Sequence, residues 1–524
     1  MSLLKSSGTI GGLTLVSRVA GFAREMIFAR VLGANEVTDA FFQAFILPNV
    51  FRRLFAEGAF SAAFVPMFSK RLHGEGGLES ARGFSTDVLS VFLPILIGVA
   101  ILFELAMPGV IWLLADKPVE PRQFDLATDL ARITFPYIVL VSLVTLFTGM
   151  LNSVSRFAPG ASFPIILNLM MIGALLGGER WIATGATIEQ VAYLLSWTVA
   201  AAGVAQLGWL IYWVRVAGFS IRIRRPRLTP EVKRLGIIAL PAAIGGGAYQ
   251  INTLLQLYFL NQLEGSAVSY MNYADRLNQL PLGIIGIALG TAILPALSRH
   301  IGGGEKASAD RVQSNAIELA MLLTLPATIA LAVCGSAFVT MIFQGGRFDA
   351  NDAAIVGNVV VALVAGLPAY VLVKVLVPAF YARADTKTPL YAALASLAFF
   401  IGFNIIFLER FGVLGVAAAS AIGAWLNTAT LYVALARRGH YAMPAALLGR
   451  LLRQFVAATA MGLVLWFASG LLIDYYAAGL FARLFALLAL TLSGALVYFG
   501  VAYAVGAVDR ERIALLLRRR KASS

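Results

Sequence analysis

Charged side chains are scarce in this sequence of 524 residues: Asp, Glu, Lys and Arg together make up 13% of it. Soluble domains usually carry about 25% charged residues. Hydrophobic residues make up 59% of the chain, and the mean hydropathy is +0.82. This composition excludes a water-soluble fold and leaves no room for a separate soluble domain.

Cysteine and histidine are nearly absent. The one cysteine, Cys334, lies in an apolar run, so neither a disulfide framework nor a thiolate metal site can form. The histidines, His73, His300 and His440, are scattered beside basic loops, and we interpret them as solvated. The sequence has no GxxxxGK[ST] loop and no obvious nucleophile and base pair within the apolar runs. We therefore expect no metal, no cofactor and no enzymatic activity.

Apolar stretches of about 20 residues recur along the whole chain, and each can cross a hydrocarbon core about 30 Å thick. We predict an all-α polytopic membrane protein with about fourteen transmembrane helices. The predicted spans are residues 8–31, 37–69, 85–115, 127–153, 157–178, 187–214, 232–263, 266–298, 312–343, 353–382, 388–408, 412–436, 446–473 and 479–506.

The basic residues alternate along the connections between these spans. The even-numbered connections are rich in Lys and Arg, whereas the odd-numbered ones hold only Lys117, Arg122, Arg180, Arg347 and Arg410. Because Lys and Arg concentrate on the cytoplasmic side of membrane proteins, both termini are predicted to be cytoplasmic. The formal charge of +14 is thus explained by topology. A nucleic-acid partner is not expected, since the charge does not gather on one domain.

A faint internal repeat predicts two halves. Residues 58–70 read GAFSAAFVPMFSK and residues 287–299 read IALGTAILPALSR, each ending the second span of a half. Two six-helix bundles related by this pseudo-repeat follow a common transporter plan, and two helices are left over. The predicted domains are an N-terminal bundle (1–215), a basic cytoplasmic linker (216–231), a C-terminal bundle (232–438), a two-helix appendage (439–508) and a basic cytoplasmic tail (509–524).

Ionisable residues inside the first span point to a hydrated interior. An Arg at the centre of a membrane helix costs about 2.5 to 3.5 kcal/mol, so several together imply water or a counter-charge. On a helical wheel, one arc of about 120° carries polar residues and the rest of the first span is apolar. The arc holds Ser17, Arg18, Gly21, Arg24, Glu25 and Phe28.

The second and eighth spans carry similar clusters. In the second span, an arc of about 120° groups polar residues, while Arg52 falls outside it unless Pro48 kinks the helix. The arc holds Asp39, Gln43, Asn49, Arg53 and Glu57. Arg53 and Glu57 could simply neutralise each other at i, i+4 spacing. In the eighth span, Asp275 could likewise neutralise Arg276.

The surplus of arginine favours an anionic ligand. A planar guanidinium offers two parallel hydrogen bonds to phosphate and stays charged when partly dehydrated. Arg18, Arg24, Arg52 and Arg276 therefore predict a site for a phosphate or diphosphate headgroup. Without an ATPase motif, an ion gradient, the membrane potential or consumption of the product would have to drive transport.

Three segments resemble a known family over essentially the whole chain. Residues 21–70 read GFAREMIFARVLGANEVTDAFFQAFILPNVFRRLFAEGAFSAAFVPMFSK, residues 273–299 read YADRLNQLPLGIIGIALGTAILPALSR, and residues 381–389 read YARADTKTP. These segments are similar to the MurJ/MviN lipid II flippases of bacterial inner membranes, in the multidrug/oligosaccharidyl-lipid/polysaccharide exporter superfamily.

The resemblance implies two six-helix bundles around a V-shaped cavity, with two extra helices forming a groove for the lipid tail. It implies lipid II as substrate, moved to the periplasmic leaflet by alternating access, with membrane lipids and cell-wall synthesis proteins as partners. The family's essential cavity arginines fall on Arg18, Arg24, Arg52 and Arg276, and other polar family positions on Asp39, Asn49, Glu57 and Asp275.

The sequence differs from the family pattern at two positions, and three alternative functions stay open. An acidic position of some relatives is Gln279 here, and Leu408 stands where a sodium site near Asn404 would need a carboxylate, so no sodium site is expected. The alternatives are a flippase for another prenyl-diphosphate-linked glycan, a drug antiporter of the same superfamily, and a scaffold for cell-wall synthesis that transports nothing. Four arginines suit a cationic drug poorly.

Overall fold

The computed structural model describes residues 3–53, 60–115, 121–220, 222–476 and 478–507. These residues form helices and no named strand, which confirms the all-α class for this part of the chain. Every predicted span coincides there with one helix, with part of one, or with a consecutive pair. Within the described ranges, nine helices or helix pairs are long and apolar enough to cross a membrane. The count of fourteen crossings stays a prediction.

The chain forms two compact units. Unit 1 holds the described residues up to Ser269 together with Gly345–Phe348, and unit 2 holds Tyr270–Gln344 and the described residues from Asp349 onward. The helices that make up unit 1 are α1 (Leu3–Leu32), α2 (Glu36–Arg52), α3 (Phe60–Leu72), α4 (Gly77–Ala115), α5 (Pro121–Thr134), α6 (Tyr137–Ser153), α7 (Ala158–Ala183), α8 (Ile188–Val216) and α9 (Pro230–Asn261).

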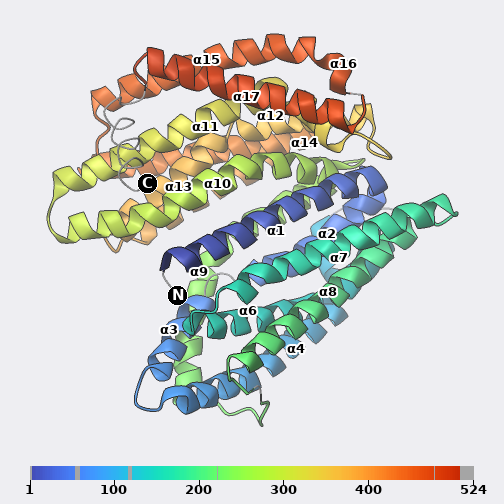
Figure 1. The fold of residues 1–524 in the computed structure, drawn as a ribbon, viewed down its shortest axis with the longest axis vertical. Coiled ribbons are helices and arrows are strands. Elements are labelled where there is room, and N and C mark those ends of the chain that lie inside the picture. The colour runs from blue at the N-terminus through green and yellow to red at the C-terminus, as the bar shows by residue number, and fades with distance from the viewer. Residues whose placement is uncertain (1–2, 54–59, 116–120, 221, 477, 508–524) are drawn as a thin grey trace. The chain divides into compact units, whose positions relative to one another are not determined.

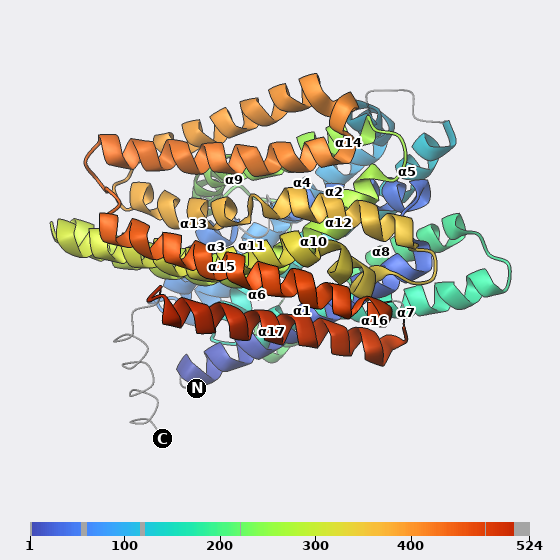
Figure 2. The same cartoon turned by 90° about the horizontal axis from the view of Figure 1, so that it is seen from above.

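Unit 2 contains most of α10 and all later helices. Its helices are α10 (Ala267–Gly302), α11 (Lys306–Phe343), α12 (Ala350–Val364), α13 (Leu367–Tyr381), α14 (Lys387–Arg437), α15 (Ala445–Leu471), α16 (Ile473–Tyr476) and α17 (Leu480–Ala504). The predicted appendage corresponds to α15 and α17, which lie side by side in Figure 2 and both pack on α11. The predicted tail, 509–524, lies outside the described residues.

Two predicted spans are split into shorter helices, and a third covers two described helices. The span 37–69 becomes α2 and α3, and residues 54–59 between them lie outside the described ranges. The span 127–153 becomes α5 and α6, with Pro136 as the N-cap of α6. The span 353–382 becomes α12 and α13, with Pro368 in the first turn of α13. Proline cannot donate the backbone hydrogen bond that a continuous helix needs, so it marks both of these breaks.

Two other predicted spans, 388–408 and 412–436, are joined in α14. The helix is interrupted at Gly412, whose φ of 53° and ψ of −140° are not helical. Glycine adopts a positive φ at little steric cost. The predicted boundary between these spans therefore coincides with a break in one long helix.

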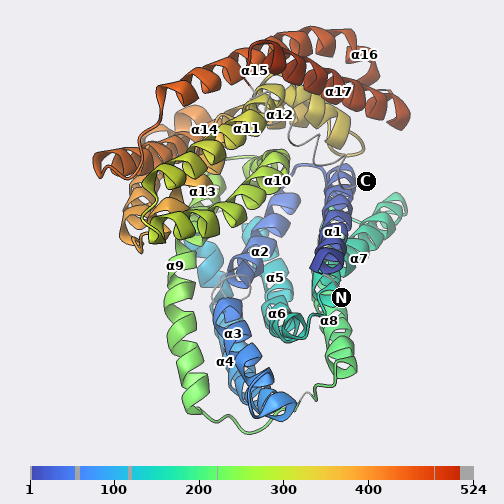
Figure 3. The same ribbon diagram turned by 60° about the vertical axis from the view of Figure 1, so that its left-hand side comes forward.

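Helix α9 belongs to unit 1, although the predicted C-terminal bundle begins at residue 232. It packs on α3 and α4, as Figure 3 shows. An ion pair of 3.3 Å joins Arg71 to Glu231 at one end, and the Asn261 side chain donates to the Leu114 carbonyl over 3.0 Å at the other. The unit boundary thus falls at Ser269 and not within 216–231. The bundle boundaries taken from the repeat are a different division and stay a prediction.

Aromatic rings dominate one core of unit 1. Phe64 stacks with Phe60, Phe68 and Phe84 at centroid distances of 5.4 to 5.7 Å. Large apolar side chains also remain exposed on the helices of each unit, such as Leu105 at 77% and Trp466 at 69%. Such exposure would cause aggregation in water and is typical of a surface that faces lipid.

Candidate functional site

The polar arc of α1 packs against α7. Arg24 donates to the Asn168 side-chain oxygen over 3.1 Å, and Asn168 donates to the Ser17 carbonyl over 3.1 Å. Gly21 faces the same amide, because a Cβ there would stand 3.5 Å from Asn168 Nδ2. The helices α1 and α7 lie side by side in Figure 1. The polar residues of α1 therefore have a defined partner on a second helix.

Arg24 also forms an ion pair with its neighbour. Its Nη2 lies 2.5 Å from Glu25 Oε1, and the two side chains are 13% and 5% exposed. Charge-assisted hydrogen bonds of this kind are the strongest that side chains make. In this conformation, Arg24 is thus held in place and its charge is balanced by Glu25. By contrast, Arg18 is exposed on the same arc.

The arginines of α2 stand at its C-terminal end. Arg52 Nε donates to Asn49 Oδ1 over 3.3 Å, and Asn49 donates to the Phe45 carbonyl over 3.1 Å. The sequence offers Arg52 no acidic partner one turn away, and the structure supplies an amide three residues earlier. Arg53 is half-buried at the C-cap position. Glu57 lies outside the described residues, so the Arg53 and Glu57 pair stays a prediction.

The Asp39 carboxylate accepts hydrogen bonds from backbone groups. Asp39 is 5% exposed, and its carboxylate accepts hydrogen bonds from the Ser269 N–H at 2.8 Å and the Val268 N–H at 3.2 Å. The Ser269 hydroxyl donates to the same carboxylate. These N–H groups belong to the first turn of α10, where a helix has donors without internal partners. Asp39 therefore acts as an N-cap for α10 from another helix.

The remaining predicted residues lie on α10 within unit 2. Gln279 donates to Asp275 Oδ2 over 2.7 Å, one turn apart. Asp275, Arg276 and Gln279 are half-buried, whereas Tyr273 and Ala274 on the opposite side are fully buried. The face of α10 that carries Arg276 is thus the more accessible one.

The predicted set is divided between the units. Unit 1 holds the members from α1 and α2, and unit 2 holds Asp275 and Arg276. The structure brings Ser17 and Arg24 together through Asn168, and Arg52 together with Asn49. That all of these residues line one cavity stays a prediction.

Asn168 and Ser269 are two partners that the sequence reasoning missed. Asn168 is the one amide in the otherwise apolar run 163–178, which is a usable signal because unpaired amides are costly in an apolar interior. Ser269 carries no such signal, since its role depends on where α10 begins.

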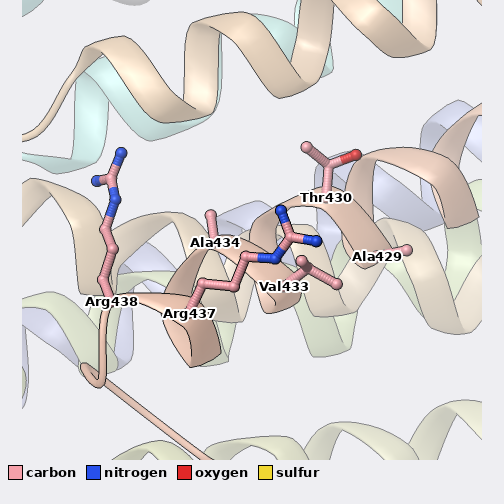
Figure 4. Close-up of a pocket in the computed structure, with 6 residues that line it drawn as sticks. All are labelled: Ala429, Thr430, Val433, Ala434, Arg437 and Arg438. Atoms are coloured by element: carbon pink, nitrogen blue, oxygen red, sulfur yellow. The ribbon is translucent and has the colours of Figure 1, made fainter.

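A pocket of about 480 Å³ lies elsewhere, at the C-terminal end of α14 (Figure 4). Its lining consists of Ala429, Thr430, Val433, Ala434, Arg437 and Arg438. Arg438 is held by Asp385 at 2.5 Å and Thr388 at 2.9 Å. The pocket is shallow and contains none of the predicted site residues, so we do not place the functional site there.

The chain matches one protein family over most of its length. The profile of the family described as "Lipid II flippase MurJ" matches residues 28–487. A probable lipid II flippase MurJ of Rhizobium tropici is 41% identical over 99% of this chain and 98% of the relative. The corresponding protein of Rhizobium meliloti strain 1021 is 40% identical over 100% and 98%. The lipid II flippase MurJ of Burkholderia cenocepacia is 32% identical over 84% and 85%.

Solved structures show the same fold. A lipid II flippase MurJ in an inward closed conformation matches with a TM-score of 0.75 at 22% identity, covering 94% of this chain and 97% of that one. An inward-facing transporter of the multidrug resistance MATE family matches with a TM-score of 0.66 at 15% identity, covering 81% and 94%. The fold is thus that of polytopic membrane transporters, and the expected all-α polytopic class is confirmed.

Proposed function

Because the chain belongs to the lipid II flippase MurJ family, whose members are transporters and not enzymes, we propose that it moves lipid II across a bacterial inner membrane. Transport runs from the cytoplasmic to the periplasmic leaflet by alternating access, and both termini are cytoplasmic. The likeness of the Rhizobium relatives over nearly the full chain supports this substrate.

The position of Arg24 is the observation that carries the role of the arginines. Its guanidinium is held by Asn168 and balanced by Glu25 on the polar arc of a helix whose Val16 and Val19 are 53% and 62% exposed. A positioned guanidinium loses little rotamer freedom when it binds phosphate. The diphosphate of lipid II would replace Glu25 as the partner of Arg24.

The other arginines extend this anion site. Arg18 is exposed on the arc of Arg24, and Arg52 is oriented by Asn49. Arg276 lies on the accessible face of α10. We propose that these guanidiniums bind the diphosphate and the adjoining headgroup while the prenyl tail stays in lipid. The anionic headgroup is what makes spontaneous flipping slow, so neutralising it lowers the barrier.

Depletion and complementation test this function. Cells depleted of the protein should accumulate labelled lipid II in the inner leaflet, and the wild-type gene should reverse the accumulation. Arg24→Ala and Arg276→Ala should fail to do so at equal protein level. Arg30→Ala is the matched control on α1, because Arg30 forms an exposed ion pair with Glu179; this variant should complement.

Each alternative has its own outcome in that experiment. Accumulation of a different prenyl-linked glycan would show that lipid II is the wrong substrate. Full complementation by Arg24→Ala and Arg276→Ala would contradict the role of the arginines, as expected of a scaffold.

A further inference from the structure

The connection between α8 and α9 (Figure 3) carries a group of arginines that the proposed anion site does not use. They are Arg222, Arg224, Arg225 and Arg227. All four are exposed, and none of them forms an ion pair within the described part of the chain. The one acid among residues 215–234 is Glu231, which pairs with Arg71. Residues 222–228, called the arginine segment below, therefore carry positive charge that the described residues do not balance.

The connection is fixed to unit 1 on both sides of the arginine segment. Before it, Phe219 is 2% exposed and packs on Phe68 at a centroid distance of 5.5 Å. Arg82 of α4 donates to the Gly218 carbonyl over 3.1 Å. After it, Thr229 is the N-cap of α9. The arginines are thus held on a defined surface and do not belong to a free loop.

A hydrogen bond to α4 places the arginine segment at the level where that helix becomes apolar. The Arg224 N–H donates to the Ser90 hydroxyl over 2.9 Å. Before Ser90, the helix carries Glu79, Arg82 and Asp87, whereas residues 91–103 contain no charged or polar side chain. Charged side chains stay at the membrane surface and a long apolar run enters the hydrocarbon. Ser90 therefore marks the boundary between the two, and Arg224 lies beside it.

The end of α8 indicates the same level. Trp209 and Tyr212 are 37% and 58% exposed, and both rings contact Trp213 at centroid distances of 5.8 and 5.5 Å. Trp and Tyr gather where the bilayer meets water. Helix α8 ends at Val216, shortly after this aromatic group. The chain that follows is therefore expected at the headgroups.

Exposed apolar side chains alternate with the arginines. Ile223 is 64% exposed and Leu228 is 77% exposed. Basic side chains attract anionic headgroups, and apolar side chains between them enter the boundary of the acyl chains. A surface that only faced water would have no use for the apolar pair. This combination is typical of a segment that lies on a membrane.

Several backbone donors of the arginine segment also lack an acceptor. The N–H groups of Ile223, Arg225, Arg227 and Leu228 make no hydrogen bond within the described residues. A backbone N–H is a strong donor that needs a partner. Phosphate oxygens can accept from these N–H groups as well as from the guanidiniums.

We infer that the arginine segment binds the phosphate groups of anionic phospholipids and anchors the connection between α8 and α9 to the membrane surface. This inference goes beyond the proposed function, because the ligand is a lipid of the bilayer and not the transported molecule. An acidic soluble protein would match the charge of the segment. The exposed Ile223 and Leu228, at the level where α4 becomes apolar, favour lipid.

Hydrogen exchange of the full-length protein in nanodiscs tests this binding. The unbonded amides of the arginine segment should exchange more slowly in phosphatidylglycerol than in phosphatidylcholine. We expect a difference of about fivefold, which corresponds to about 1 kcal/mol. High salt should shrink the difference, because it screens exposed charges. Equal exchange in the two lipids, or a difference that high salt leaves unchanged, would overturn the inference.

A variant without the guanidiniums tests the role of the arginines. It combines Arg222→Gln, Arg224→Gln, Arg225→Gln and Arg227→Gln. In this variant the exchange rates in the two lipids should become equal. Because these side chains form no ion pair in the described chain, the melting temperature in detergent should stay close to that of the wild type. A lipid difference that persists in this variant would refute binding through the arginines.

The matched control removes the same amount of charge from unit 2. It combines Arg299→Gln, Lys306→Gln, Arg311→Gln and Lys387→Gln, which replace exposed basic residues without an ion pair in the described part of the chain. The arginine segment of this control should keep its lipid difference. Loss of the difference here as well would show that total charge, and not this segment, selects the lipid.

A variant without the exposed apolar side chains tests contact with the acyl boundary. Ile223→Ser together with Leu228→Ser keeps every positive charge. The lipid difference should become smaller but should still respond to salt. An undiminished difference would contradict insertion of these side chains into the membrane surface.

Two soluble anions distinguish a lipid headgroup from other sources of negative charge. Inorganic phosphate added to phosphatidylcholine nanodiscs should not slow exchange of the arginine segment; slowing equal to that in phosphatidylglycerol would assign the segment to a free anion. Polyglutamate added to the same nanodiscs should slow exchange less than phosphatidylglycerol does. A stronger effect of polyglutamate would overturn the inference in favour of an acidic protein.

Discussion

The Asp39 carboxylate on α2 lies 2.8 Å from the backbone nitrogen of Ser269, in the first turn of α10. A second backbone N–H, that of Val268, donates to the same side chain over 3.2 Å. The cap of α10 is thus supplied by a residue more than two hundred positions earlier in the chain. Asp39 and the first turn of α10 both belong to unit 1.

Asp39→Ala should therefore lower stability through α10. Loss of an N-cap costs about 1 kcal/mol, and two N–H donors would lose their acceptor. We expect a lower melting temperature and faster hydrogen exchange of the amides at the start of α10. Asp39→Asn keeps one acceptor oxygen and should lose less. Equal melting temperatures for Asp39→Ala and the wild type would contradict the capping role.

Asn35→Ala serves as the matched control for this test. Asn35 caps α2 through a bond of 3.0 Å to the Thr38 N–H, so its removal also deletes one N-cap from unit 1. Asn35→Ala should speed up hydrogen exchange of the amides at the start of α2. The amides at the start of α10 should stay protected. The same exchange pattern in both variants would show a global loss of stability instead of two separate caps.

Removal of Asn168 should weaken binding through the orientation of Arg24. Asn168→Leu removes the acceptor that holds Arg24 and the donor to Ser17. Without it, the guanidinium samples more rotamers, and binding of a lipid diphosphate should weaken by about tenfold, which corresponds to about 1.4 kcal/mol. The measurement is titration of the purified protein with lipid II in detergent.

Asn427→Leu is a suitable comparison for Asn168→Leu, because Asn427 lies on α14 and none of the predicted site residues belongs to that helix. The affinity of the Asn427→Leu variant for lipid II should stay within twofold of the wild-type value. An unchanged affinity in Asn168→Leu would mean that Arg24 needs no positioning.

Hydropathy predicted where the helices lie. It did not predict which residues of different helices contact one another. Apolar run length depends only on neighbouring residues, so helices such as α7 and α15 were located to within a few residues. The breaks inside longer spans depend on single residues, such as Pro136 and Pro368, whose effect varies with the local backbone. The length of an apolar run does not reveal these breaks.

The partners of the site residues could not be read from periodicity. The helical wheel placed Arg24 on a polar arc, but its acceptor Asn168 is 144 residues away. The wheel likewise grouped Asp39 with Asn49. In the structure, Asp39 accepts hydrogen bonds from backbone N–H groups that lie 229 and 230 residues later in the chain. Every residue except proline has such a donor, so no sequence pattern distinguishes the N–H groups at a helix start.

Glycine at position 346 should be required for the docking of Gly345–Phe348 on α1. The Arg347 N–H donates to the Arg30 carbonyl over 2.9 Å. A Cβ on Gly346 would stand 2.2 Å from that carbonyl oxygen, and the φ of Gly346 is +59°. Gly346→Ala should displace the segment, which should appear as faster hydrogen exchange of the Arg347 amide and a lower melting temperature.

Gly185→Ala separates backbone strain from collision in this prediction. Gly185 also has a positive φ, +109°, but nothing lies within 4 Å of a Cβ there. Gly185→Ala should lower the stability only by the strain of the left-handed backbone region, about 1 to 2 kcal/mol. The hydrogen exchange of the Arg347 amide should not change. If both variants lost the same stability and the Arg347 amide stayed protected, the close approach to Arg30 would not matter.

Asp385 should make stability depend on pH in the acid range. The side-chain and backbone hydrogen bonds of Thr388, with a further contribution from Arg438, hold the pKa of Asp385 below its ordinary value of 3.8. A group whose pKa is lower in the folded state stabilises the fold at higher pH. This contribution is fully present above about pH 4 and is lost as the pH falls through the folded pKa.

Asp385→Asn should therefore be less stable than the wild type at pH 7. The difference should be about 1 kcal/mol, the usual effect of a lost capping or partly exposed charged hydrogen bond, because Asp385 accepts from Lys387 and Thr388 at the start of α14. Melting curves at decreasing pH should show the two proteins converging below pH 4. Thr388→Val removes a further bond, which the Thr388 hydroxyl donates to Asp385 over 2.6 Å, and should have a smaller effect in the same window. A stability difference independent of pH would mean that the shape of Asp385, and not its charge, stabilises this turn.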